Sequence, residues 1–165
     1  MKLIVTNKAL SLGQGSSVKD TEGKDVYKVK GKVFSVTKKK KIYDLDGNLL
    51  FIVRNKWFNF LHHSAYIYNA EGEQVAKVFA KNFKFEKRFY VDGYSEPITI
   101  DGKLFKLGYT VNMNEKPVAI ITGKFRVFAL GDQFEIETEN TELMPMLVAL
   151  TIAMDNISDN RQRED

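Results

Sequence analysis

The apolar segment between Leu143 and Met154 constrains what this chain can fold into more than any other feature. Its sequence, LMPMLVALTIAM, contains no charged residue, so a helix formed from it would be apolar on every face. Such a helix must be surrounded by other apolar groups. At about 1.5 Å per residue it is roughly 18 Å long, well short of the ~30 Å hydrocarbon layer of a bilayer. The sequence therefore predicts a buried core helix rather than a membrane span.

The residues around this segment predict where the helix begins and ends. Thr141, or Asn140 before it, can accept hydrogen bonds from the first free backbone N–H groups, and Pro145 falls in the first turn, where a missing N–H group costs little. The polar residues that follow Met154 predict an end near residue 156, which gives a helix over about 142–156. The residues expected to form the buried face of this core helix are Leu143, Met146, Leu147, Leu150, Ile152 and Met154.

Length and composition indicate one compact domain. The 165 residues suffice for a sizeable core, which we expect within residues 1–158, followed by a polar tail at 159–165. The chain contains no cysteine, which excludes thiolate metal sites and suits a cytoplasmic protein. No secretory signal is predicted because Asn7 and Lys8 interrupt the first apolar run, and no transmembrane segment is predicted elsewhere. The net charge of +4 is too small to identify a partner.

A repeated unit occupies the first half of the chain. The acidic-Gly pairs end at Gly23, Gly47 and Gly72, which lie 24 and 25 residues apart. In each unit a β-rich run precedes the turn and another follows it, and similar segments begin at Lys8, Lys32, Lys56 and Lys81. The pattern predicts a β-hairpin plus a connecting strand in every unit, with glycine supplying the positive φ that the turn requires.

The apolar helix decides how these hairpins are arranged. A helix about 10–12 Å across needs a closed sheet wider than the eight-stranded barrels that side chains alone can fill. The hairpin units, together with further strands near Pro117–Ile120, Ile98, Tyr109–Val111 and Phe134–Ile136, give about twelve strands. We therefore expect a mainly β protein, a closed barrel of about twelve strands around the C-terminal hydrophobic helix.

Several stretches of the chain resemble a known family. They are KALSLG (Lys8–Gly13), VKDTEGKDVYKVKG (Val18–Gly31), VFSVTKKKKIYDLDG (Val33–Gly47), YIYNAEGEQVAKV (Tyr66–Val78) and GDQFEI (Gly131–Ile136), followed by the apolar segment that closes on Ala153-Met154-Asp155. The chain resembles a bacterial member of the LURP-one-related family, which shares the tubby-like fold with tubby C-terminal domains and phospholipid scramblases. The resemblance implies the fold and carries no established biochemical activity.

Motifs for catalysis or for metal binding are missing, so we expect no enzymatic activity, no catalytic residue, no metal and no cofactor. His62 and His63 are adjacent and would point to opposite sides of a strand. The chain contains no nucleophile elbow, phosphate loop or dinucleotide fingerprint. The segment from Asp44 to Asn48 begins like a calcium loop, but Leu50 and Ile52 occupy later ligand positions, which favours a hairpin turn.

A run of lysines offers the strongest candidate for a binding site. Lys38, Lys39, Lys40 and Lys41 precede a predicted strand, and Arg54 and Lys56 on the next strand can approach them across a hairpin. These residues are the candidate ligands for anionic lipid head groups, each contributing about 1 kcal/mol near a membrane. The resemblance supports this hypothesis because some tubby domains bind phosphoinositides through basic residues on the barrel wall. The residues alone favour a solvated turn that resists aggregation.

Two binding hypotheses therefore stay open. The protein associates weakly with an anionic membrane surface as a peripheral protein, or it serves as a protein-interaction scaffold without lipid binding. Nucleic-acid binding is not favoured, because the alternation of Lys84 with Phe83 and Phe85 is also what an ordinary half-buried strand produces. Trp57 has smaller counterparts in the other repeats, and its orientation stays open.

Overall fold

The computed structural model describes residues 1–6, 16–31, 37–56, 64–82, 87–102, 108–124 and 133–161. Within these ranges the strands are β1 (Lys2–Thr6), β2 (Ser16–Asp20), β3 (Asp25–Gly31), β4 (Lys40–Tyr43), β5 (Leu49–Arg54), β6 (Ser64–Tyr68), β7 (Gln74–Asn82), β8 (Lys87–Asp92), β9 (Ile98–Gly102), β10 (Gly108–Met113), β11 (Lys116–Lys124) and β12 (Gln133–Thr138). A short 3₁₀ helix, η1 (Thr141–Leu143), leads into the helix α2 (Met144–Arg161).

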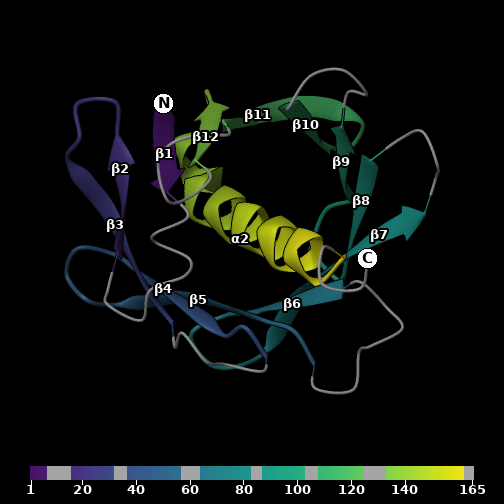
Figure 1. Ribbon diagram of the computed structural model, residues 1–165, viewed down its shortest axis with the longest axis horizontal. Coiled ribbons are helices and arrows are strands. Elements are labelled where there is room, and N and C mark those ends of the chain that lie inside the picture. The colour runs from purple at the N-terminus through teal and green to yellow at the C-terminus, as the bar shows by residue number, and fades with distance from the viewer. Residues whose placement is uncertain are drawn as a thin grey trace.

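The strands form one closed antiparallel barrel (Figure 1). Each strand pairs with its neighbours in the sequence, and β1 closes the sheet by pairing with both β12 and β2. The backbone amide of Thr138 donates to the carbonyl oxygen of Met1, which joins the two ends of the sheet directly. The predicted barrel of about twelve strands with a C-terminal helix is confirmed.

Side chains alternate between the inside and the outside of the barrel. On β4 and β5, Ile42 lies opposite Phe51 in the register, and both belong to the core, while the neighbouring pair formed by Lys41 and Ile52 faces outward. The same alternation continues around the sheet. The fully buried residues with the largest side chains include Leu3, Ile42, Ile67, Ile100, Ile121, Ile136, Leu147, Leu150 and Ile152.

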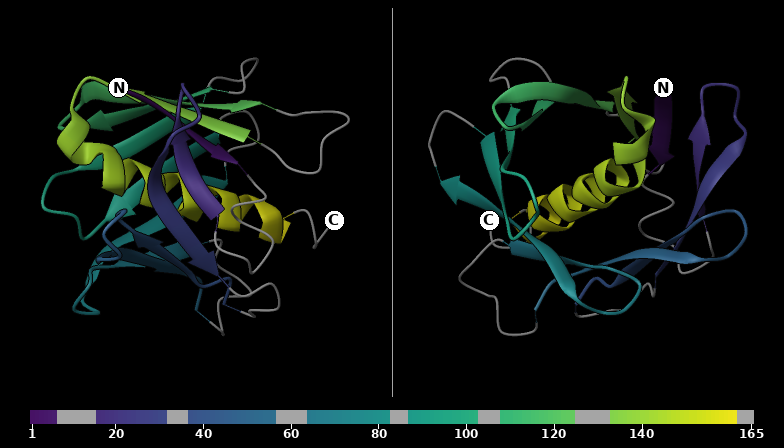
Figure 2. Two further views of the ribbon diagram at one scale, coloured as in Figure 1. Left: turned by 90° about the vertical axis from the view of Figure 1, so that its left-hand side faces the viewer. Right: turned by 180° about the vertical axis from the view of Figure 1, so that it is seen from behind.

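Helix α2 crosses the interior of the barrel (Figure 2). Every residue from 146 to 157 is buried, and the helix joins the strands in one hydrophobic core. The predicted core residues from Met146 to Met154 lie on this helix, whereas Leu143 belongs to η1 and is half-buried. Asn140 caps η1, since its side-chain oxygen accepts a hydrogen bond of 3.1 Å from the Glu142 amide.

The helix continues to Arg161, beyond the end that the polar residues predict. Asp155 and Asn156 are polar, yet both are buried, so they do not mark the surface. The side-chain amide of Asn156 donates to the backbone oxygen of Lys38 at 3.2 Å, and the Lys38 ammonium donates back to the Asn156 backbone oxygen at 3.4 Å. These bonds satisfy polar groups inside the barrel, which allows the helix to extend past its apolar segment.

The predicted hairpin turns are present. Gly23, Gly47 and Gly72 have φ angles of +83°, +92° and +87°, which residues with a Cβ atom rarely adopt. Gly93, which lies outside the three repeated turns, has the same conformation at φ +87°. The connecting strands expected after Lys8, Lys32 and Lys56 fall almost entirely outside the described residues.

Gly47→Ala should destabilise the protein by about 1 kcal/mol, because the left-handed conformation strains any residue with a Cβ atom. No atom lies within 4 Å of the position that the new Cβ would occupy, so the cost comes from the backbone alone. Gly108→Ala is the matched control, because its Cβ also meets open space and its φ is not positive. Urea unfolding should show a lower midpoint for Gly47→Ala only; equal midpoints would contradict the role assigned to the turn.

Candidate functional site

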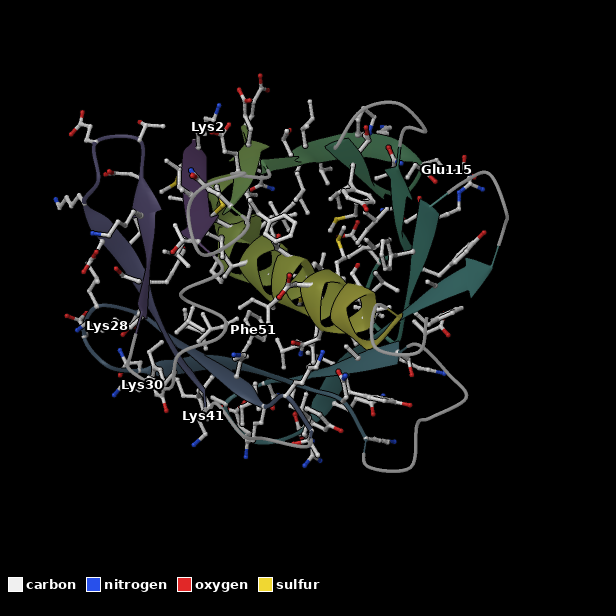
Figure 3. All side chains as sticks on the ribbon, in the orientation of Figure 1. Lys2, Lys28, Lys30, Lys41, Phe51 and Glu115 are labelled. Atoms are coloured by element: carbon white, nitrogen blue, oxygen red, sulfur yellow. The ribbon has the colours of Figure 1, made fainter. Side chains whose placement is uncertain are left out.

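Cations gather on the outer surface of strands β3 to β7. Strand alternation directs these side chains outward, as the register shows: Lys30 lies opposite Lys41, and Arg54 lies opposite Tyr66, which in turn lies opposite Lys77. In Figure 3, Lys28, Lys30 and Lys41 point away from the barrel, whereas Phe51 points inward. We call this surface the basic wall; its cations are Lys28, Lys30, Lys41, Arg54, Lys56 and Lys77.

Aromatic rings hold several of these cations in place. The Lys56 ammonium lies 4.3 Å from the centre of the Tyr66 ring, and the Arg54 guanidinium lies 4.6 Å from the centre of the Tyr68 ring. Both tyrosines belong to the outer face of β6, yet they are only 8% and 9% exposed. Two longer contacts follow the same pattern, Lys30 over Tyr43 at 5.2 Å and Lys77 over Phe79 at 5.3 Å. Cation–π contacts fix the position of a charge without neutralising it.

Three cations elsewhere on the barrel, Lys2, Lys19 and Arg88, are paired with carboxylates. Lys2 pairs with Glu135 at 2.9 Å, and that hydrogen bond raises the pKa of the Lys2 ammonium. Lys19 lies 3.1 Å from Asp25, whose pKa is lowered first by the Ser17 hydroxyl and then by Lys19 itself. In the part of the chain that the structure describes, no carboxylate forms such an ion pair with a cation of the basic wall. The wall therefore carries an excess of positive charge. It is offset in part by Asp25, whose pKa Lys28 helps to lower, and by Asp92, which lies opposite Lys77 in the register.

The predicted cluster of lysines is divided by the start of β4. Lys41 faces outward on the basic wall, and Lys39 is exposed just before the strand. Lys40 instead points into the barrel and is 7% exposed, because alternation places it beside Val53. Gly31 opposite makes room for it, since a Cβ atom there would lie 2.6 Å from the Lys40 side chain.

Lys38 does not belong to the outer surface either. It is half-buried, has a positive φ of 46°, and is bonded to Asn156 at the end of α2. Of the residues predicted from the sequence, the structure thus brings Lys41, Arg54 and Lys56 together on one surface. Lys38 and Lys40 contribute to the interior instead.

Sequence reasoning missed Lys28, Lys30 and Lys77, as well as the aromatic rings beneath the cations. The alternation of outward and buried residues along each strand could have identified some of them. Lys28 and Lys30 flank the buried Val29, and Tyr66 and Tyr68 flank the buried Ile67. Period-2 spacing places each such pair on one outer face. What the sequence did not reveal is that the outer faces of the strands from β3 to β7 form one continuous surface.

Another surface carries charge that is already paired. Arg88, Thr99, Asp101, Asn112 and Glu115 line a shallow depression on β8 to β11. Arg88 forms an ion pair with Asp101, and the Asn112 side-chain amide donates to the other oxygen of that carboxylate at 2.9 Å. Hydrogen bonds to Tyr90 and Asp101 raise the pKa of Arg88 further. These contacts leave little charge for a ligand.

The turn between β4 and β5 is a hairpin turn, as predicted. The Asp44 carboxylate accepts hydrogen bonds from the backbone amide and the side-chain amide of Asn48, each at 2.7 Å, and these bonds stabilise the turn. Within the described ranges, no three His, Cys, Asp or Glu side chains are placed to hold a metal. Trp57, His62, His63 and the segment 83–85 lie outside these ranges. None of the helices that the structure describes is long and apolar enough to cross a bilayer.

A closed barrel of this kind around a C-terminal helix defines the tubby-like class of folds. The sequence matches the LURP-one-related family over residues 1–155, and the chain belongs to that family. An X-ray structure of a protein from Arabidopsis thaliana superimposes with a TM-score of 0.59, covering 95% of this chain and 91% of that one at 11% identity. This likeness concerns the fold alone. No curated protein matches the sequence.

Proposed function

We propose that the protein is a non-enzymatic, cytoplasmic tubby-like barrel that binds anionic phospholipid head groups through the basic wall. The observation that supports this proposal is the difference between its two kinds of cation. Four cations of the basic wall, Lys30, Arg54, Lys56 and Lys77, lie over aromatic rings. By contrast, Lys2, Lys19 and Arg88 pair with carboxylates. Lysines and arginines held in this way keep their charge for an external anion.

The arrangement of the wall also costs stability that another role must offset. Lys30 and Lys41 are directly opposed in the register, and like charges in that position destabilise a sheet. Strand stability alone would favour an acidic residue at one of the two positions. A phosphate group placed between two such ammonium groups would relieve their repulsion, which is why we favour an anionic ligand over a purely structural role.

Affinity for a membrane should come from several weak contacts. Each cation near an anionic surface contributes about 1 kcal/mol, and the contribution declines within a Debye length of about 8 Å at physiological ionic strength. A wall of a few such charges predicts weak, reversible and salt-sensitive association. The scaffold alternative, which relies on apolar contacts, predicts binding that salt does not weaken.

Co-sedimentation with vesicles tests the proposal. Phosphatidylcholine vesicles with rising phosphatidylserine content should bind increasing amounts of protein, and pure phosphatidylcholine should bind none. The bound fraction should fall as salt rises from about 0.01 to about 1 M, because the Debye length shrinks from about 30 to about 3 Å. Binding that depends on neither the lipid charge nor the salt concentration would contradict the proposal, as would the absence of binding.

A further inference from the structure

Negative charge gathers at one end of the barrel. Because neighbouring strands are antiparallel, the hairpin turns that follow β2, β4, β6, β8 and β10 belong to the same rim of the barrel as the start of α2. We call it the acidic end; its carboxylates are Asp20, Glu22, Asp44, Asp46, Glu71, Glu73, Asp92, Glu96, Glu115, Glu139 and Glu142. The basic groups that the structure describes at this end are fewer. Lys24 and Lys116 lie in the turns, the ammonium groups of Lys19 and Lys28 donate to the backbone oxygens of Gly23 and Leu45, and Lys2 and the amino group of Met1 lie at the start of β1.

Some of these carboxylates hold the turns, and others do not. Asp20 accepts hydrogen bonds of 2.9 Å from the amides of both Glu22 and Lys24. The hydrogen bonds from Asn48 lower the pKa of Asp44, which keeps that carboxylate charged in mildly acidic solution. By contrast, Glu71 and Asp46 are exposed at the tips of their turns, where their charge is directed into solvent.

Positive charge lies toward the opposite end, where α2 terminates. Lys30, Arg54 and Lys56 lie at or just beyond the ends of β3 and β5 on that side, and the exposed Lys39 lies just before β4. We call this the basic end. The two kinds of charge are therefore separated along the barrel axis. The basic wall extends from the basic end toward the acidic end.

The separation is large compared with the range of the electrostatic interaction. The 18 residues of α2 run along the interior from the acidic end to the basic end, and at 1.5 Å per residue they span about 27 Å. The Debye length is about 8 Å at physiological ionic strength. If the wall lay flat on an anionic surface, Asp46 and Glu71 would come within that range and be repelled. If the basic end faced the surface, these carboxylates would lie beyond it.

We propose that the protein docks on anionic membranes in one orientation, with the basic end toward the lipid and the acidic end pointing into solvent. This inference rests on the proposed function and narrows it, since only the cations of the basic wall that lie toward the basic end, rather than the whole wall, would meet the lipid. The partner is an anionic lipid surface, and the acidic end acts as the repulsive element that excludes the flat and inverted orientations.

Single labels can test this orientation because the chain contains no cysteine. A fluorophore would be attached at Ser158→Cys near the basic end, at Leu45→Cys in an acidic turn, or at Ile120→Cys on the opposite wall. All three positions are exposed and uncharged, so the labels leave the electrostatics intact. With phosphatidylserine-containing vesicles that carry a nitroxide on the lipid head groups, the Ser158 label should be strongly quenched and the other two should remain bright.

A second variant weakens the repulsive element. Glu22→Gln, Asp46→Asn and Glu71→Gln together neutralise carboxylates that accept no hydrogen bond within the described residues. Eight of the eleven carboxylates remain in this background, so the repulsion is weaker but not abolished, and the quenching of the Leu45 label should increase relative to that of the Ser158 label. Equal quenching of all three labels in the unsubstituted background, or no change at Leu45 after neutralisation, would overturn the orientation alone. Vesicles that bind no protein would overturn the proposed function together with it.

Discussion

Leu150→Asp is expected to leave no soluble, folded protein. Leu150 is 1% exposed and lies on α2 among the apolar side chains of the barrel core. Placing an unpaired carboxylate there costs several kcal/mol, and the burial of the leucine side chain, worth about 1.5–3 kcal/mol, is lost as well. Since domains are stable by only about 5–15 kcal/mol, the sum approaches the whole stability.

The control for this variant lies on the same helix. Ser158→Asp introduces the same charge at an exposed position of α2 and should change the thermal midpoint little. Circular dichroism and analytical gel filtration would compare the two proteins at equal concentration. A soluble Leu150→Asp protein with a midpoint close to that of Ser158→Asp would show that α2 does not occupy the core.

Reversing two charges of the basic wall is expected to abolish binding to anionic vesicles. Lys41→Glu combined with Arg54→Glu removes two attractive charges worth about 1 kcal/mol each, which corresponds to roughly 30-fold in affinity, and adds repulsion beyond that. Both side chains face outward, so the barrel should remain folded. Lys40 is left unchanged because a glutamate there would place a carboxylate inside the barrel.

The matched control changes the net charge by the same amount elsewhere. Lys24→Glu combined with Lys116→Glu alters two exposed lysines in the turns of the acidic end. If the basic wall carries the interaction, this control should bind vesicles nearly as well as the unsubstituted protein. Equal losses in the two double variants would mean that net charge, rather than the wall, governs binding.

Local sequence signals predicted the fold well because its elements are local. The acidic-Gly turns define hairpins from residues close together in the chain, and a charge-free helix can be stable only when it is enclosed. The end of α2 was not predictable in the same way. The buried side chain of Asn156 donates to the Lys38 backbone, which is distant in the sequence and becomes a partner only in the closed barrel.

The candidate site was predictable only in part, for a related reason. Arg54 and Lys56 were selected correctly as neighbours of Lys41, because a hairpin links their strands. The run from Lys38 to Lys41 was interpreted as one cluster, but a one-residue difference in the start of β4 decides which lysines face outward. Lys77 belongs to the same wall because β7 pairs with β6, which in turn pairs with β5. No local sequence pattern connects Lys77 to Lys41.

The placement of α2 also bears on how the protein is made. All the strands precede α2 in the chain, so ribosomes synthesise the element that fills the barrel last. The sheet likewise cannot close before β12 has been synthesised, since β1 and β12 are distant in the sequence and pair with each other. A nascent chain therefore carries unpaired strand edges and an unfilled interior until synthesis reaches its C-terminal part. The barrel therefore cannot finish folding before α2 has been synthesised, and chaperones that shield exposed edges would matter most until then.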